Sequence, residues 1–160
     1  MNLRSLSVLA AFAFLAACSS NPDSSSQTAG GANAGGAAAV ATPGSREDFI
    51  QNVGDRVFFD LDKSVIKPEG TTVLQRQAAW LQKYPNVTVT IEGHCDERGT
   101  REYNLALGER RATAVKNALV ALGIPANRIQ TISYGKERPA VVGSNEAAWA
   151  QNRRGVTVIN

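Results

Sequence analysis

Cysteine and histidine are scarce in this chain of 160 residues. The only cysteines are Cys18 and Cys95 and the only histidine is His94, so the sequence can supply neither a disulfide framework nor a four-ligand zinc module. Acidic and basic residues nearly balance, and a formal net charge of +3 is too small to indicate a nucleic-acid partner by itself. With 43% hydrophobic residues, the chain is expected to form one domain of modest size with extensions.

The main apolar run near the N-terminus is too short to cross a bilayer comfortably. Arg4 precedes this run, residues 6–17, and the combination is typical of an export signal, which we place at residues 1–17. Its end, "LAAC", resembles the bacterial lipoprotein signal, in which the cysteine, here Cys18, is lipidated and becomes the first mature residue. An ordinary secretory signal cleaved nearby is the alternative. Because Ser19 rather than Asp follows, the same resemblance implies an outer-membrane anchor that faces the periplasm.

Small and polar residues fill the next stretch, "SSNPDSSSQTAGGANAGGAAAVATPGS", which offers almost nothing to bury. We therefore expect residues 18–45 to form the lipidated cysteine and a flexible linker without secondary structure. A Gly-rich coil of this length has a root-mean-square span of roughly 30 Å and stretches to about 90 Å. The folded domain is then expected at residues 46–160.

Hydrophobic periods of two and about 3.6 residues alternate along residues 46–160. Strands are predicted at "RVFFDL", "NVTVTIEG", "RIQTISYG" and "RRGVTVIN", and helices from Pro68 to about Tyr84, from the Thr100 cap to about Gly123, and around Glu146 to Gln151. The order predicts an α/β (α+β) sandwich of βαβαββ type, with two main helices packed on one face of a mixed four-stranded sheet. The other face of this sheet is expected to be partly open to water.

Opposite charges gather where the second strand passes into the second main helix, in "EGHCDERGTREYNLALGERRA". On a helical wheel Arg110 points away from the apolar stripe, whereas Arg111 falls beside it, on the same flank as Asn104 and Leu107. Asp96 lies in the loop before this helix, so Asp96 and Arg111 are expected to face one cleft. Either they form a surface pair, which contributes about 0 to 1 kcal/mol, or they bind a ligand with both charges, such as an amino-acid head group.

Four stretches, "GHCDERGTREYNLALGERRA", "VFFDLDK", "SYGKERPA" and "NRRGVTV", resemble the OmpA-like peptidoglycan-binding domain family over about residues 57–159. In that family the Asp of "GHxDERGT" and the second Arg of "GERRA" hold the diaminopimelate residue of a peptidoglycan stem peptide. The resemblance therefore implies this role for Asp96 and Arg111. It implies accessory roles near the ligand for Asp62, Glu97, Arg98 and Leu107, with Leu61 at a place where the family often has Phe. Asn104 either contacts this ligand or only hydrogen-bonds the nearby loop.

The resemblance also implies a function without catalysis. Lipoprotein members of this family bind peptidoglycan without a covalent bond and tether the outer membrane to the cell wall, as part of the Tol system that acts in envelope constriction during cell division. The resemblance of this chain to these lipoproteins implies TolB as a partner, with other Tol proteins as further candidates. The alternative is an envelope adaptor whose main ligand is TolB rather than peptidoglycan.

Other chemistries have weaker support in the sequence. His94 and Cys95 are neighbours on extended chain and point to opposite faces, so they are not expected to form a nucleophile and base, and no cofactor or metal is expected. We expect Cys95 to be a small buried residue and His94 a hydrogen-bonded residue at a strand end. Arg153 and Arg154 are expected to anchor the last strand rather than to touch ligand, and Gly93 to serve as a turn residue. No partner nucleic acid is expected.

Overall fold

The computed structural model describes residues 41–160. The expected signal, residues 1–17, and the lipidated Cys18 lie outside the described residues, as does most of the expected linker. The described part begins with a short helical segment, α1 at Arg46–Asp48 and a π-helical turn at Phe49–Val53. Ser45 caps α1, because its hydroxyl oxygen accepts a hydrogen bond from the backbone N–H of Asp48 at 3.1 Å. This segment was not predicted from the sequence.

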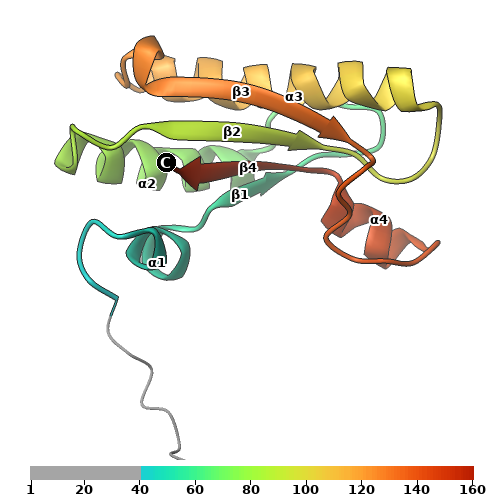
Figure 1. The fold of residues 1–160 in the computed structure, drawn as a ribbon, viewed down its shortest axis with the longest axis horizontal. Helices are drawn as coiled ribbons and strands as arrows, with labels where there is room; N and C mark the ends of the chain where they lie inside the picture. The colour runs from blue at the N-terminus through green and yellow to red at the C-terminus, as the bar shows by residue number, and fades with distance from the viewer. Residues whose placement is uncertain (1–40) are drawn as a thin grey trace, which may run out of the picture. The chain divides into compact units, whose positions relative to one another are not determined.

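Four strands form one mixed sheet in the order β1-β4-β2-β3 (Figure 1). Strands β1 and β4 are antiparallel, β4 and β2 are antiparallel, and β2 and β3 are parallel. The strands span Arg56–Phe58 (β1), Val89–His94 (β2), Ile129–Gly135 (β3) and Arg154–Ile159 (β4). The predicted mixed four-stranded sheet is therefore confirmed, with the C-terminal strand inserted between β1 and β2.

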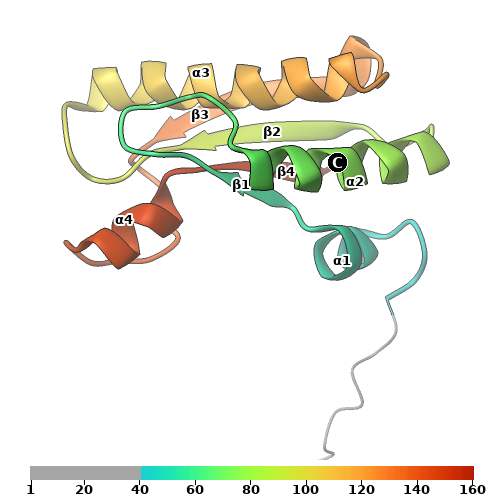
Figure 2. The same ribbon diagram turned by 180° about the vertical axis from the view of Figure 1, so that it is seen from behind.

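Two long helices cover the same face of the sheet, α2 at Pro68–Lys83 and α3 at Arg101–Ala121 (Figures 1 and 2). Pro68 stands in the first turn of α2, where its missing N–H costs no hydrogen bond. Thr100 caps α3 by accepting a hydrogen bond from the backbone N–H of Tyr103 at 3.2 Å. A shorter helix, α4 at Glu146–Asn152, directly precedes β4. The predicted helices and their common face are thus confirmed.

The hydrophobic core lies between the sheet and the two long helices. Helix α2 contributes buried side chains such as Leu74 and Leu81, α3 contributes Val115 and Leu119, and β2 contributes Ile91. The opposite face of the sheet carries residues such as Phe58 and Ile132 that are more than a third exposed, as the expected open face requires. Within residues 41–160, no helix combines the length and apolar character that a membrane span requires.

Gly93 and Gly108 bring α3 directly onto β2. A Cβ atom added to Gly93 would lie 1.9 Å from the carbonyl oxygen of Gly108, far inside van der Waals contact. Gly93 belongs to β2, so its expected role as a turn residue is wrong. The absence of a side chain instead allows helix and strand to touch, and this contact places the first turns of α3 beside the C-terminal end of β2.

Candidate functional site

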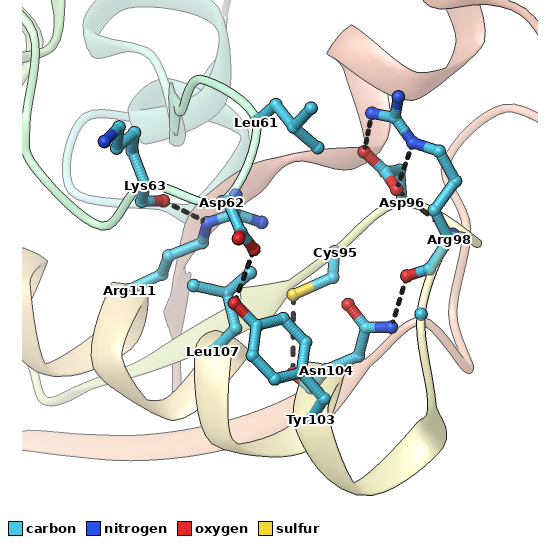
Figure 3. Close-up of a pocket in the computed structure, with 11 residues that line it drawn as sticks. Leu61, Asp62, Lys63, Cys95, Asp96, Arg98, Tyr103, Asn104, Leu107 and Arg111 are labelled. Carbon is cyan, nitrogen blue, oxygen red and sulfur yellow. Dashed lines mark hydrogen bonds and ion pairs between the residues drawn. The ribbon is translucent and has the colours of Figure 1, made fainter.

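A pocket of about 480 Å³ opens where β2 ends and α3 begins, with the loop at residues 61–63 as its opposite wall (Figure 3). The lining includes both members of the charged pair predicted from the sequence, Asp96 and Arg111. The remaining lining residues are Leu61, Asp62, Lys63, Cys95, Arg98, Gly99, Tyr103, Asn104 and Leu107. Three segments far apart in the sequence therefore meet around one concave surface.

Arg111 is completely buried, at 0% exposure, on the sheet-facing flank of α3. Its guanidinium donates hydrogen bonds to three backbone carbonyl oxygens, those of Lys63 at 2.8 Å, His94 at 2.8 Å and Asp60 at 3.0 Å. These bonds join α3 to the pocket loop and to the end of β2. Burial lowers the pKa of Arg111 from its usual value, although an arginine of this kind stays charged at neutral pH.

No carboxylate of residues 41–160 lies within ion-pair distance of Arg111. Three of its five N–H groups are used by the carbonyl oxygens, so donors remain for an additional acceptor. Neutral carbonyl oxygens solvate a buried cation but do not cancel its charge. The Arg111 end of the pocket is therefore suited to an anionic group that enters from outside.

Asp96 holds a buried negative charge at the other end of the pocket, with its side chain 5% exposed. Its Oδ1 accepts hydrogen bonds from the Nε of Arg98 at 3.0 Å and from the backbone N–H of Arg98 at 3.1 Å. Its Oδ2 accepts from Nη2 of Arg98 at 2.6 Å and from Nη1 of Arg153 at 3.4 Å. Burial alone would raise the pKa of Asp96, but the hydrogen bonds and charge of Arg98, with Arg153, outweigh it and hold the pKa below its usual value.

Asp96 and Arg111 thus line one pocket, as the helical wheel predicts, and they do not pair with each other. Arg110, the residue just before Arg111 on α3, is exposed and does not line the pocket. The sequence left open a direct ion pair between Asp96 and Arg111 as one of two alternatives. Within residues 41–160 these two side chains form no such ion pair. Two separated charges on one concave surface can hold a ligand that carries both signs.

The pocket loop carries two of the other predicted site residues. Leu61 is 54% exposed at the rim, where its side chain is free to contact a ligand. Asp62 adopts the left-handed conformation with φ 62°, and its Oδ1 accepts a hydrogen bond from the hydroxyl of Tyr103 at 2.5 Å. Together with the carbonyl bonds of Arg111, this contact holds the loop against α3 (Figure 3).

Helix α3 and the loop before it carry the remaining predicted residues. Leu107 is buried in the lining. The Nδ2 of Asn104 donates to the carbonyl oxygens of Arg98 at 2.7 Å and Thr100 at 3.0 Å, so Asn104 both lines the pocket and orders the loop. Glu97 is exposed and lies outside the lining, where its Oε1 accepts a hydrogen bond from the Nε1 of Trp149 at 3.1 Å. The structure therefore brings every predicted residue except Glu97 to the pocket.

Sequence reasoning missed the second arginine at Asp96. Arg153 does anchor the start of β4, as expected, because its Nε donates to the carbonyl oxygen of Phe59 at 3.0 Å. It also contacts Asp96 and forms an ion pair with Glu146 at 2.6 Å. No local pattern predicts this contact, because 57 residues separate Asp96 from Arg153 in the sequence. Tyr103 was also missed, although its place in the first turn of α3 made it a candidate.

His94 and Cys95 point to different surroundings, as their neighbouring positions on extended chain predict. The imidazole of His94 packs beside the ring of Tyr134 on the open side of the sheet, with ring centroids 5.6 Å apart. The Sγ of Cys95 lies 3.4 Å from the carbonyl oxygen of Asn104, and burial raises the pKa of this thiol. A thiol kept neutral and turned away from the imidazole is unsuited to act as a nucleophile.

Comparison with known proteins places this architecture in a family. Residues 58–153, more than half of the chain, match the family described as the OmpA family. The chain belongs to the OmpA family. Two of its relatives carry the name peptidoglycan-associated lipoprotein. The one from Brucella melitensis is 59% identical over 123 residues, which cover 77% of this chain and 73% of that protein. The one from Rhizobium meliloti is 55% identical over 145 residues, which cover 91% and 81%.

Solved structures of other proteins share the same fold. The crystal structure of the peptidoglycan-associated lipoprotein from Burkholderia pseudomallei matches with a TM-score of 0.68 at 39% identity, over 72% of this chain and all of that one. The C-terminal domain of Helicobacter pylori MotB matches with a TM-score of 0.62 at 22% identity, over 66% and 84%. The second likeness concerns the fold alone.

Proposed function

We propose that this protein is a non-catalytic tether that binds peptidoglycan through the diaminopimelate residue of the stem peptide. In this function, Arg111 holds the carboxylate of the amino-acid end of diaminopimelate and Asp96 attracts its ammonium group. Leu61, Leu107 and the aliphatic part of the pocket contact the hydrocarbon chain between the charged ends. No bond is made or broken, and the cell wall is held by reversible contacts.

The observation that carries this proposal is the buried guanidinium of Arg111, which has no carboxylate partner among residues 41–160 and lines the same pocket as Asp96. A buried cation without a counter-ion is costly, so an anionic ligand group at this position relieves an existing electrostatic deficit. The relatives named peptidoglycan-associated lipoprotein support peptidoglycan as the source of that group.

The tether also requires an attachment to the membrane, for which we propose lipidation of Cys18. The support is the "LAAC" stretch and the relatives named as lipoproteins. With the small residue Ser19 next, we assign the anchor to the outer membrane, with the domain in the periplasm. Cys18→Ser is expected to move the protein from the membrane fraction to the soluble fraction, and a variant that stays with the membranes contradicts the anchor.

Partnership with TolB belongs to the same proposal and is supported by the resemblance to the lipoprotein members of the family. A soluble stem peptide that fills the pocket is expected to reduce TolB capture if the two ligands share this surface. Capture of TolB by a chain that fails to bind purified cell wall would favour the alternative function, an envelope adaptor.

Sedimentation with purified sacculi tests the main proposal. The wild-type protein is expected to sediment with sacculi and to be released by free diaminopimelate, because both compete for the same pair of charges. Asp96→Asn is expected to abolish sedimentation. Arg110→Ala is the control, since it removes a charge from the exposed side of α3 outside the pocket. Sedimentation that diaminopimelate cannot reverse, or equal losses in the two variants, would refute the proposed site.

A further inference from the structure

Two arginines hold the carboxylate of Asp96, and they are held in very different ways. The side chain of Arg153 is 8% exposed, and it also donates to the carbonyl oxygen of Phe59 and pairs with Glu146. The side chain of Arg98 is 34% exposed. Within residues 41–160, the guanidinium of Arg98 forms hydrogen bonds and an ion pair only with Asp96. Arg153 is therefore fixed by several contacts of the fold, whereas Arg98 can move away from Asp96.

The guanidinium of Arg98 also contacts an aromatic ring. Its central carbon lies 4.0 Å from the centre of the Trp149 ring, in a cation–π contact with α4. Trp149 is fixed in turn, because its Nε1 donates to Glu97 at 3.1 Å. Figure 3 shows Arg98 reaching Asp96 from the side of the pocket opposite to Arg111.

We propose that Arg98 occupies Asp96 in the free protein in place of the ligand's ammonium group and is displaced when that group binds. This inference rests on the proposed function and adds to it a residue that sets the affinity for the ligand's amine. Asp96 exchanges one cation for another, so its negative charge stays compensated throughout. Arg153 keeps the carboxylate in place during the exchange, and the released Arg98 returns to water beside Trp149.

The exchange makes Arg98 a barrier to ligands that carry a free ammonium group. A ligand with a free ammonium group can replace the guanidinium at Asp96, whereas a ligand whose amine is blocked leaves the Arg98–Asp96 pair intact and loses this contact. Because Arg98 is partly exposed, the barrier is low. The affinity for a cationic ligand is therefore reduced a few-fold, whereas the affinity for its neutral derivative, which does not displace Arg98, is hardly changed. Arg98 thus narrows the preference of the pocket for the amine.

Binding of a defined peptide to the full chain tests this inference. The ligand is the tripeptide L-alanyl-γ-D-glutamyl-meso-diaminopimelate, compared with the same peptide N-acetylated at the side-chain amine of diaminopimelate. Arg98→Gln is expected to bind the free amine about two- to fivefold more tightly than the wild type, as expected from removing one partly exposed competitor. The acetylated peptide is expected to gain much less. Arg101→Gln is the control, because Arg101 carries the same charge nearby but lies outside the pocket lining.

The fluorescence of Trp149 provides a second measurement. A purely structural role of Arg98 would not change this fluorescence when the ligand binds. Displacement of the guanidinium from its present position is expected to change the fluorescence of Trp149 when the free amine binds, and the change is expected to disappear in Trp149→Phe while binding persists. Weaker binding in Arg98→Gln, or binding with no Trp149 signal, overturns this inference and leaves the proposed function standing. If the wild type binds neither the tripeptide nor sacculi, both this inference and the proposed function are overturned.

Discussion

At one end of the pocket a guanidinium is held by backbone carbonyl oxygens, whereas at the other end a carboxylate is held by side chains. Arg111 is fully buried and joins three chain segments, so its position is part of the fold. Asp96 has two arginine partners, and one of these, Arg98, is partly exposed. The comparison teaches that the two charges of one candidate site differ in how far they can be changed without damage to the structure.

The largest expected effect is at the Arg111 end. Arg111→Ala leaves three carbonyl oxygens without their donor and opens a cavity, so we expect it to destabilise the domain by about 3 kcal/mol or more and to abolish binding to sacculi. Urea denaturation measures the first loss and sedimentation the second. Arg111→Lys, which retains the charge, serves as the control and is expected to recover part of the stability. An alanine variant as stable as the wild type contradicts the structural role assigned to Arg111.

The backbone of His94 connects the two ends, since its carbonyl oxygen accepts from Arg111 and Asp96 follows two residues later. Burial lowers its pKa from 6.5 to about 4, helped by the charges of Arg154 and Arg138. The unfolded chain therefore binds a proton at a higher pH than the folded domain, and stability is lost as the pH falls from 6.5 toward 4.

The expected loss is about 2 kcal/mol between about pH 7 and about pH 5, measured by urea denaturation. His94→Gln should flatten this dependence while it preserves the carbonyl contact with Arg111. The pKa of Asp96 is held below its usual value, so its own contribution is retained across this window. An unchanged pH profile in the variant would show that another group titrates.

At the Asp96 end we expect a smaller cost in stability and a large loss of binding. Asp96→Asn keeps the shape of the side chain but removes the charge that Arg98 and Arg153 compensate, and we expect a loss of about 2 kcal/mol. Binding to the amine of diaminopimelate should weaken by more than about tenfold, because the interaction with a charged acceptor is lost. Calorimetric titration with the tripeptide measures the binding. Destabilisation as large as that of Arg111→Ala would remove the contrast between the two ends.

The smallest effect is expected at Arg110, which sits next to Arg111 on α3 but is exposed. Arg110→Ala should change stability by less than about 0.5 kcal/mol and leave binding to sacculi unchanged, as is usual for surface substitutions. Differential scanning calorimetry measures the change in stability, and sedimentation measures binding to sacculi. A loss at Arg110 that equals the loss at Arg111 would overturn the assignment of the two arginines to different faces of the helix.

Much of the fold follows from local sequence patterns. The period-two stretch "NVTVTIEG" predicts β2, and Pro68 and Thr100 predict where α2 and α3 begin. The same helical period separates Arg110 from Arg111. The π-helical turn at Phe49–Val53 was missed because it forms by packing on the core rather than through a strong local pattern. Gly93 was misassigned because its close contact is with Gly108 on a different element.

By itself, the sequence determined the order and faces of the main elements and, through the helical wheel, that Asp96 and Arg111 face one cleft. Only the tertiary structure decided what surrounds these charges: carbonyl oxygens at Arg111, and Arg98 with the distant Arg153 at Asp96. The physical reason is that periodicity records which side of a helix or strand a residue occupies. The partners of a buried charge depend instead on how distant segments are brought together, and burial makes each of those contacts strong.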